Sequence, residues 1–275
     1  MRIAVYQSRT GIDPAANADG LVAAIGSAKA GGADMLFTPE MSGLLDRDRR
    51  RAAAHLHDEA GDPVLAEVCA AAGRAGLWVN LGSLALAGGA DGRLVNRGFV
   101  IDDRGAIRAR YDKIHLFDVD LPSGESWRES AAYAPGERSV IAATPWAKIG
   151  LSICYDIRFP DLYRALSDAG AELLSIPAAF TVPTGRAHWH VLLRARAIEA
   201  GAFVVAAAQS GEHEDGRATF GHSLVVDPWG QVLLDMGEEE GVGFADLDMG
   251  RLIDVRARVP ALRHRRPIAP VEVSA

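Results

Sequence analysis

The sequence has only two cysteines, Cys69 and Cys154, among 275 residues. Two thiols are too few for a disulfide framework or for a metal site with four cysteine ligands. Because free thiols persist in reducing compartments, the sequence favours a cytoplasmic location. Each cysteine is therefore either a small buried apolar residue or a reactive group.

Long apolar runs and excess positive charge are also missing. No stretch approaches the roughly 20 apolar residues that a membrane-spanning helix requires. The first residues predict a strand, without the charged start and apolar core of a signal peptide. The formal net charge is −7, whereas nucleic-acid binding needs a basic face. We interpret the short basic run 263–266 as a solvated tail, and expect neither a membrane nor a nucleic acid as partner.

Lysine is the scarce basic residue. Only three of the 29 lysines and arginines are lysines: Lys29, Lys113 and Lys148. A lysine amine can change its protonation state, whereas the guanidinium of arginine cannot. Lys113, flanked by aromatic and aliphatic residues, is therefore a candidate for chemistry. A solvated lysine is an equally good interpretation of the residue alone.

Short apolar runs alternate with helical stretches, which indicates an α/β protein. The apolar spacing in residues 189–200 is that of a helix. No linker interrupts the chain, so we expect one domain over residues 1–275. Strands are predicted at residues 2–7, 35–39, 77–86, 96–101, 149–154, 173–177, 203–208, 223–227 and 243–247.

An internal similarity predicts two related halves. Residues 32–39 match residues 170–177 in type and order, and residues 2–5 match residues 148–151. Two similar sheets could then pack face to face with helices outside. The alternative is that helix-turn-strand units commonly look alike.

The similarity also isolates Glu40. After the matching prolines the first half has Glu40, where the second half has Ala178. A carboxylate at the end of an apolar strand does not serve sheet stability, and open α/β sheets place their chemistry at the carboxyl ends of strands. Glu40 is therefore a candidate functional residue.

Cys154 lies where an apolar strand runs into a predicted helix that begins at residues 156–160. This strand-turn-helix layout exposes nucleophiles in other hydrolases. Backbone N–H groups at the start of the helix, that of Tyr155 in particular, could hold a developing oxyanion. Cys69 lies in an apolar helical segment and is interpreted as a core residue.

Acyl transfer by cysteine needs a base, a proton donor for the leaving nitrogen and oxyanion stabilisation. Glu40, Lys113 and Cys154 could supply these parts. Members of such a group meet only in the fold, so sequence spacing leaves a Cys-His arrangement open. The available histidines are His115, His188, His190 and His222.

Three motifs in this order resemble the nitrilase superfamily of carbon–nitrogen hydrolases, over nearly the whole chain. They are residues 37–40, 111–117 and 150–160, which contain Glu40, Lys113 and Cys154 respectively. The resemblance implies a four-layer α-β-β-α sandwich, no cofactor, no metal, and a homodimer or larger homo-oligomer. It makes Glu40 the general base, Cys154 the nucleophile and Lys113 the oxyanion stabiliser, which favours them over the histidines.

The resemblance assigns Glu129 to position the lysine and the substrate, with Glu125 as a nearby competitor interpreted as a loop carboxylate. Residues 187–199, 206–211 and 221–230 resemble the amidases of deaminated glutathione, which react through a cysteine thioester. The alternatives are ω-amidases of 2-oxoglutaramate, N-carbamoyl amino acid hydrolases, and a silent scaffold on the same fold.

Both of the first two substrates carry a carboxylate, which the guanidinium of Arg158 could clamp bidentately. A structural ion pair of Arg158 with Asp156 or Asp161 is the alternative. The residues expected to contact the small amide substrate are Tyr155, Arg158, Phe117, Trp127, Phe180 and Thr181.

Overall fold

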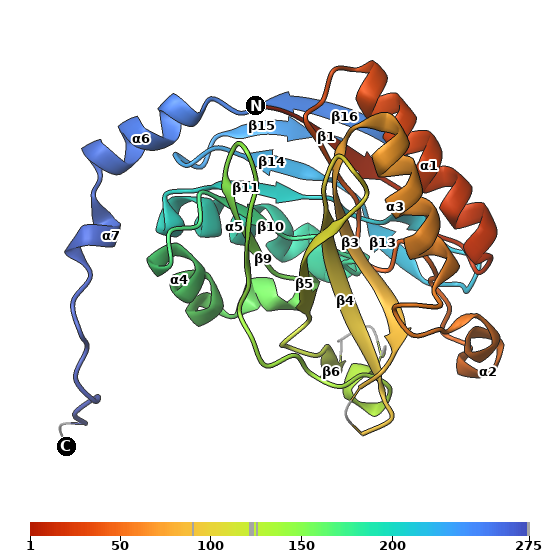
Figure 1. The fold of residues 1–275 in the computed structure, drawn as a ribbon. Coiled ribbons are helices and arrows are strands. Elements are labelled where there is room, and N and C mark those ends of the chain that lie inside the picture. The colour runs from red at the N-terminus through yellow and green to blue at the C-terminus, as the bar shows by residue number, and fades with distance from the viewer. Residues whose placement is uncertain (90, 121–123, 125, 274–275) are drawn as a thin grey trace.

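The computed structural model describes residues 1–89, 91–120, 124 and 126–273. Two six-stranded sheets stack against each other (Figure 1). The first has the order β16 (Gly241–Asp246), β1 (Arg2–Gln7), β2 (Met35–Phe37), β3 (Trp78–Ala87), β4 (Leu94–Ile101) and β5 (Ile107–Asp112). The second has the order β15 (Val232–Asp235), β14 (Leu224–Val226), β11 (Phe203–Ala206), β10 (Leu173–Ser175), β9 (Lys148–Leu151) and β8 (Ile141–Ala143).

The two sheets share one plan. Strands β1, β2 and β3 are parallel in the first sheet, as β9, β10 and β11 are in the second. In each sheet two antiparallel strands follow on one side, β4 and β5 or β14 and β15. A single antiparallel strand closes the other side, β16 or β8. This correspondence agrees with the two related halves expected from the sequence.

Helices form the outer layers. α1 (Pro14–Ala30) and α3 (Pro63–Ala75) lie side by side over the first sheet, and α4 (Pro160–Asp168) and α5 (Val182–Ala200) cover the second (Figure 1). Both α1 and α3 begin at an Asp-Pro pair. The carboxylates of Asp13 and Asp62 accept backbone N–H groups of the first turn, and proline suits the first helical position. The predicted four-layer α-β-β-α sandwich is confirmed.

Smaller elements connect these layers. They are α2 (Arg49–Ala52), β6 (Asp118–Asp120), β7 (Ser126–Arg128), β12 (Ser210–Glu212), β13 (Ala218–Phe220), α6 (Met249–Arg258), α7 (Ala261–His264) and the 3₁₀ turns η1 (Ala53–His55), η2 (Glu129–Ala131) and η3 (Cys154–Arg158). Glu125 lies outside the described residues. Among those described, no helix combines the length and apolar character needed to cross a membrane.

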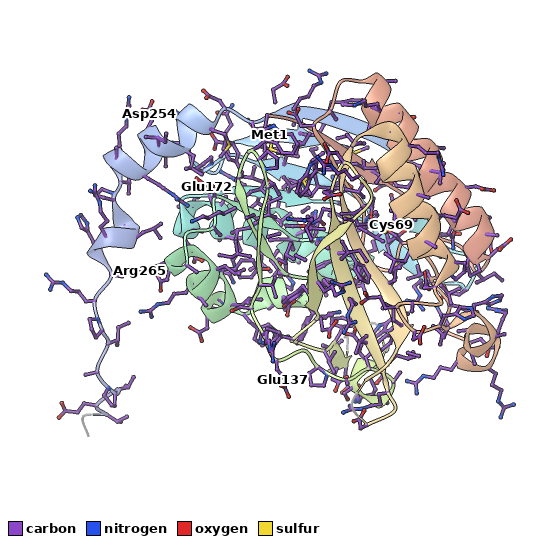
Figure 2. The ribbon with its side chains drawn as sticks, viewed as in Figure 1. Met1, Cys69, Glu137, Glu172, Asp254 and Arg265 are labelled. Atoms are coloured by element: carbon purple, nitrogen blue, oxygen red, sulfur yellow. The ribbon has the colours of Figure 1, made fainter. Side chains whose placement is uncertain are left out.

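The apolar strands of the first sheet are buried on both faces. Ile3 and Val5 belong to the core shared with the second sheet, whereas Ala4 between them packs in the core under α1 and α3. Side chains alternate across a strand, so a strand covered on both faces must be continuously apolar. Figure 2 shows Cys69 on α3 in this outer layer, where it is partly buried and packs against the core, so it lies at the edge of the core and not inside it as predicted.

Several predicted strands end earlier than expected, and three of these ends matter for the site. β2 ends at Phe37, β9 at Leu151 and β10 at Ser175, two or three residues before the predicted limits. The chain turns out of the ladder there. Cys154 is therefore not in a strand but begins the turn η3, with a left-handed φ of 48°.

Gly82 on β3 allows the backbone that leads to Glu40 to come close. An added Cβ would collide with the carbonyl oxygens of Thr38 and Pro39. We predict that Gly82→Ala lowers the free energy of unfolding by about 1–3 kcal/mol, the usual cost of overpacking. Urea unfolding followed by circular dichroism measures this.

The matched control is Gly26→Ala on α1, where an added Cβ meets no heavy atom within 4 Å. Alanine favours a helix over glycine by up to about 1 kcal/mol, so this variant should be as stable as the wild type or more so. Equal stability of Gly82→Ala and Gly26→Ala would contradict the close approach.

Candidate active site

Three polar side chains converge in the interior between the sheets. Glu40 follows β2, Lys113 directly follows β5, and Cys154 follows β9. Their exposed fractions are 4%, 2% and 8%. Buried ionisable groups are costly unless they are paired, so this grouping needs a compensating set of contacts.

Lys113 supplies the pairing. Its Nζ donates to Glu40 Oε1 at 2.9 Å and to Glu129 Oε2 at 2.9 Å, so one ammonium bridges two carboxylates. Glu129, at the start of η2, also accepts the backbone N–H of Phe117 at 2.6 Å. The structure thus brings together Glu40, Lys113 and Glu129, as the sequence predicted for a lysine held by a second glutamate.

Glu40 links the amine to the thiol. Its carboxylate is hydrogen-bonded to the Cys154 side chain, and its Oε2 accepts the backbone N–H of Ala179 at 2.9 Å. Its Oε1 accepts a further N–H from Asn96 at 2.9 Å. One buried carboxylate therefore contacts an ammonium, a thiol and two neutral donors.

These contacts move the pKa values in opposite directions. Burial raises the pKa of Glu40, but the charge and hydrogen bond of Lys113 outweigh it, with help from Cys154 and Asn96, and hold it below the usual 4.5. Burial and the neighbouring Glu40 raise the pKa of Cys154 well above 9.0. Burial opposes the charge of Lys113, but Glu129 and Glu40 keep its pKa well above 10.5. The resting site holds a carboxylate, an ammonium and a neutral thiol.

The turn that presents Cys154 is fixed by Asp156. This fully buried carboxylate accepts the Tyr111 hydroxyl at 2.7 Å, the Ile153 N–H at 2.8 Å and the His115 N–H at 3.0 Å. The N–H of Cys154 itself donates to Pro177 O at 2.8 Å. Tyr155 is the second residue of the turn, and the first N–H groups of a helical turn have no acceptor within it. Its N–H can therefore serve a ligand near the sulfur.

An aromatic wall includes Tyr155, the residue after Cys154. The rings of Phe117 and Tyr155 lie 5.1 Å apart and those of Phe117 and Trp127 6.3 Å apart. The guanidinium of Arg158 lies over Tyr155 at 5.8 Å and over Phe180 at 5.3 Å. Five of the six expected substrate contacts thus form one connected surface.

The sixth expected contact, Thr181, follows Phe180 directly and occupies the N-cap position of α5. Its hydroxyl pairs with that of Thr184 at 2.7 Å in the first turn of α5, and its backbone bridges to Thr219. The hydroxyl therefore already has a local partner in the helix start.

The histidines that could form a Cys-His pair are engaged elsewhere. His115 Nδ1 pairs with Asp156 at 2.7 Å, His188 with Arg158 at 3.3 Å, and both His190 and His222 with Asp235. Within the described ranges, none of the four is a hydrogen-bond partner of Cys154.

Arg158 forms no ion pair with Asp156 or Asp161, both of which are described residues. The alternative prediction, in which Arg158 serves a structural ion pair with one of them, is therefore wrong.

Sequence reasoning missed two polar side chains that hold Glu40. Asn96 donates to Glu40 Oε1. The Gln209 amide donates to the Glu40 backbone carbonyl at 2.9 Å. The oxygen of that amide accepts hydrogen bonds from the Ser8 hydroxyl and the Thr10 backbone N–H. Both are almost fully buried. The only signal was a polar residue at a strand end or inside an apolar strand, which by itself names no partner.

A buried thiol, carboxylate and amine at the strand ends of an α-β-β-α sandwich are the groups that a cysteine-dependent hydrolase requires. The carbon-nitrogen hydrolase family model matches residues 2–257. The chain belongs to this family, part of the nitrilase superfamily, and is an amidase that hydrolyses carbon–nitrogen bonds.

Known proteins similar to the chain fit this class. Human deaminated glutathione amidase is 42% identical over 240 residues, 86% of this chain and 73% of that protein. The NitFhit protein of C. elegans superposes with a TM-score of 0.89 at 36% identity, covering 96% of this chain and 65% of that one. A mutant amidase of Nesterenkonia sp. AN1, with acrylamide added at its active-site cysteine, has a TM-score of 0.77 at 29% identity, covering 94% of this chain and 98% of that one.

Proposed function

We propose that Cys154 is the nucleophile of this amidase and Glu40 its general base, with Lys113 as oxyanion donor and Glu129 holding the lysine. The observation that carries the proposal is the single carboxylate of Glu40, in contact with both the Cys154 thiol and the Lys113 ammonium. A base must lie within hydrogen-bond reach of the proton it takes. Glu40 meets this condition.

The first step joins proton transfer to attack. The Cys154 proton moves to Glu40 as the sulfur forms a bond to the amide carbon and the carbonyl π electrons move to oxygen. The pKa difference makes a resting thiolate unfavourable, so proton transfer proceeds only as that bond forms. The oxyanion is held by Lys113 Nζ and the Tyr155 N–H, the kind of preorganised donors that stabilise such charge.

The second half returns the enzyme to its start. Protonated Glu40 gives its proton to the leaving nitrogen as the carbon–nitrogen bond breaks, which leaves a thioester on Cys154. Water, deprotonated by Glu40, then attacks the thioester. The sulfur leaves as a thiolate and takes the proton back, and the acid product departs. Apart from the substrate and one water molecule, these steps use only side chains and backbone of the chain.

We propose a small carboxylate-bearing amide as the substrate, deaminated glutathione first and 2-oxoglutaramate as the alternative. The name of the human relative supports the first. Arg158 supports the class, because its guanidinium lies on the aromatic wall that includes Tyr155 and, among the described residues, has no carboxylate partner. We propose it as the clamp for the substrate carboxylate.

We further propose that residues 1–275 are one domain that forms a homodimer in the cytoplasm. An apolar groove of about 560 Å³ supports the dimer, lined by Ile198, Trp229, Val259 and others. Val191 and Ile198 on α5 are 68% and 53% exposed. Exposed apolar surface of this kind commonly marks a protein contact. Two unpaired thiols support the reducing location.

The proposal predicts that Cys154→Ala and Glu40→Gln lose at least about 100-fold in kcat/KM, on the scale of other losses of catalytic groups. The assay follows amine or ammonia release from a panel of deaminated glutathione, 2-oxoglutaramate, N-carbamoyl amino acids and simple nitriles. Deaminated glutathione should give the highest kcat/KM.

Cys69→Ala is the matched control and should retain full activity, because Cys69 lies on α3 in the outer layer. Circular dichroism checks that each variant folds. Substantial turnover in folded Cys154→Ala would remove the thiol from the mechanism, and a preference for nitriles would overturn the substrate class.

The pKa directions predict a broad pH profile. The free enzyme needs ionised Glu40, whose pKa lies below 4.5, and protonated Cys154, whose pKa lies above 9.0. The plot of kcat/KM should therefore be level between about pH 5 and pH 9. A Cys-His enzyme would instead lose activity near the usual histidine pKa of about 6.5. An acid limb centred there would contradict Glu40 as the base.

A further inference from the structure

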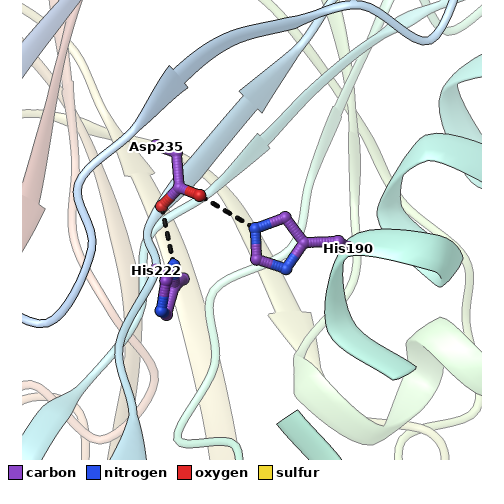
Figure 3. A group of neighbouring side chains, drawn as sticks. All are labelled: His190, His222 and Asp235. Carbon is purple, nitrogen blue, oxygen red and sulfur yellow. Dashed lines mark hydrogen bonds and ion pairs between the residues drawn. The ribbon is translucent and has the colours of Figure 1, made fainter. Parts of the chain in front are cut away.

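A second cluster of chemically capable side chains lies outside the catalytic group. His190 comes from α5, His222 from the link between β13 and β14, and Asp235 from the end of β15. Figure 3 shows the two imidazoles pointing at opposite oxygens of the Asp235 carboxylate. His190 Nε2 lies 2.9 Å from Oδ2, and His222 Nδ1 lies 2.8 Å from Oδ1. The potential ligand atoms all fall within 4.8 Å of one another.

We propose that His190, His222 and Asp235 form a binding site for a divalent transition-metal ion such as Zn²⁺. Two imidazoles and one carboxylate are a ligand set that such ions prefer, whereas Mg²⁺ and Ca²⁺ prefer oxygen ligands. His190 and His222 are partly exposed and Asp235 is exposed, so water can reach the remaining coordination position.

The geometry needs only a small adjustment, in which the two N···O distances of 2.8 and 2.9 Å lengthen and the wider separations within 4.8 Å shorten. Zinc bonds to nitrogen and oxygen are about 2.0–2.2 Å long, so tetrahedral ligand atoms stand roughly 3.3 Å apart. Each ring nitrogen that faces Asp235 now shares a proton with it. A neutral imidazole can carry that proton on its other nitrogen, which frees a lone pair for the metal without net proton release.

The cluster is also built on rigid supports. His222 has a left-handed φ of 54°, its N–H donates to Gly237 O, and its carbonyl accepts Trp189 Nε1 at 2.8 Å. Phe220 stacks on the His222 ring at 4.5 Å. Such outer contacts orient metal-binding histidines.

The same supports connect the cluster to the aromatic wall. The Phe220 N–H donates to Phe180 O at 2.9 Å, and the Trp189 ring lies 4.9 Å from that of Phe180. Phe180 in turn lies under Arg158. An ion bound at the cluster would fix the positions of the residues that contact Phe180 and would stabilise the folded state. This effect does not depend on the catalytic proposal.

The test is calorimetric titration of tag-free protein with Zn²⁺. A Cys154→Ala background prevents the active-site thiol from binding zinc. We expect one Zn²⁺ per chain, no competition from Mg²⁺, and a higher melting temperature with zinc. Co²⁺ should give visible ligand-field absorption. His190→Gln, His222→Asn and Asp235→Asn should each weaken binding more than about 100-fold, since even outer-shell changes cost about 10- to 100-fold.

Asparagine tolerates the left-handed backbone of residue 222, so that variant should still fold. His264→Gln, which alters an exposed histidine on α7, is the matched control and should bind zinc like the background. Absence of saturable zinc binding would overturn the proposed site, and so would equal zinc binding in the three cluster variants and the background. The cluster would then be only a hydrogen-bonded contact between α5, β15 and the link that carries His222.

Discussion

One buried ammonium holds the active centre together. Lys113 bridges Glu40 and Glu129 in an environment that excludes nearly all water, and removing one partner of a buried ion pair typically costs about 3–5 kcal/mol. The lysine therefore sets the charge of Glu40, and through Glu40 it sets the state of the Cys154 thiol. Its amine remains charged because two carboxylates face it. Without the charge and hydrogen bond of Lys113, burial would raise the pKa of Glu40 instead of leaving it below the usual value.

The sandwich makes this arrangement possible. One strand of each sheet ends in the buried interior between the sheets. Glu40 after β2 and Cys154 after β9 therefore meet there although they are far apart in the chain. Asn96, Gln209 and Asp156 then hold the backbone and side chains that flank them. The left-handed φ of Cys154 turns the thiol out of the ladder and toward the carboxylate. The related plan of the two sheets accounts for this symmetry of positions.

Much of this could be predicted because the informative residues lie next to recognisable strand ends. Apolar runs predicted most central strands, and the repeated Gly-Ala turn predicted the related sheets. The rest depends on contacts between distant residues. Asn96 reaches Glu40 from another strand, and no local pattern names that partner. Strands β2 and β10 end before their predicted limits because Pro39 and Pro177 continue the apolar run beyond the last residue that pairs in the sheet. The strand pair β6–β7 does alternate between polar and apolar residues, but each strand has only three residues, too few for the pattern to predict a strand.

The central claim is that the Cys154 sulfur becomes acylated while Glu40 carries the proton. Acid quenching during turnover of deaminated glutathione, followed by peptide mass spectrometry, tests it most directly. We expect the peptide that contains Cys154 to gain the mass of the acyl part of the substrate, and hydroxylamine, which cleaves thioesters, to remove it. Continued amine release with the acyl group on Cys69, or on a residue whose bond resists hydroxylamine, would contradict the account.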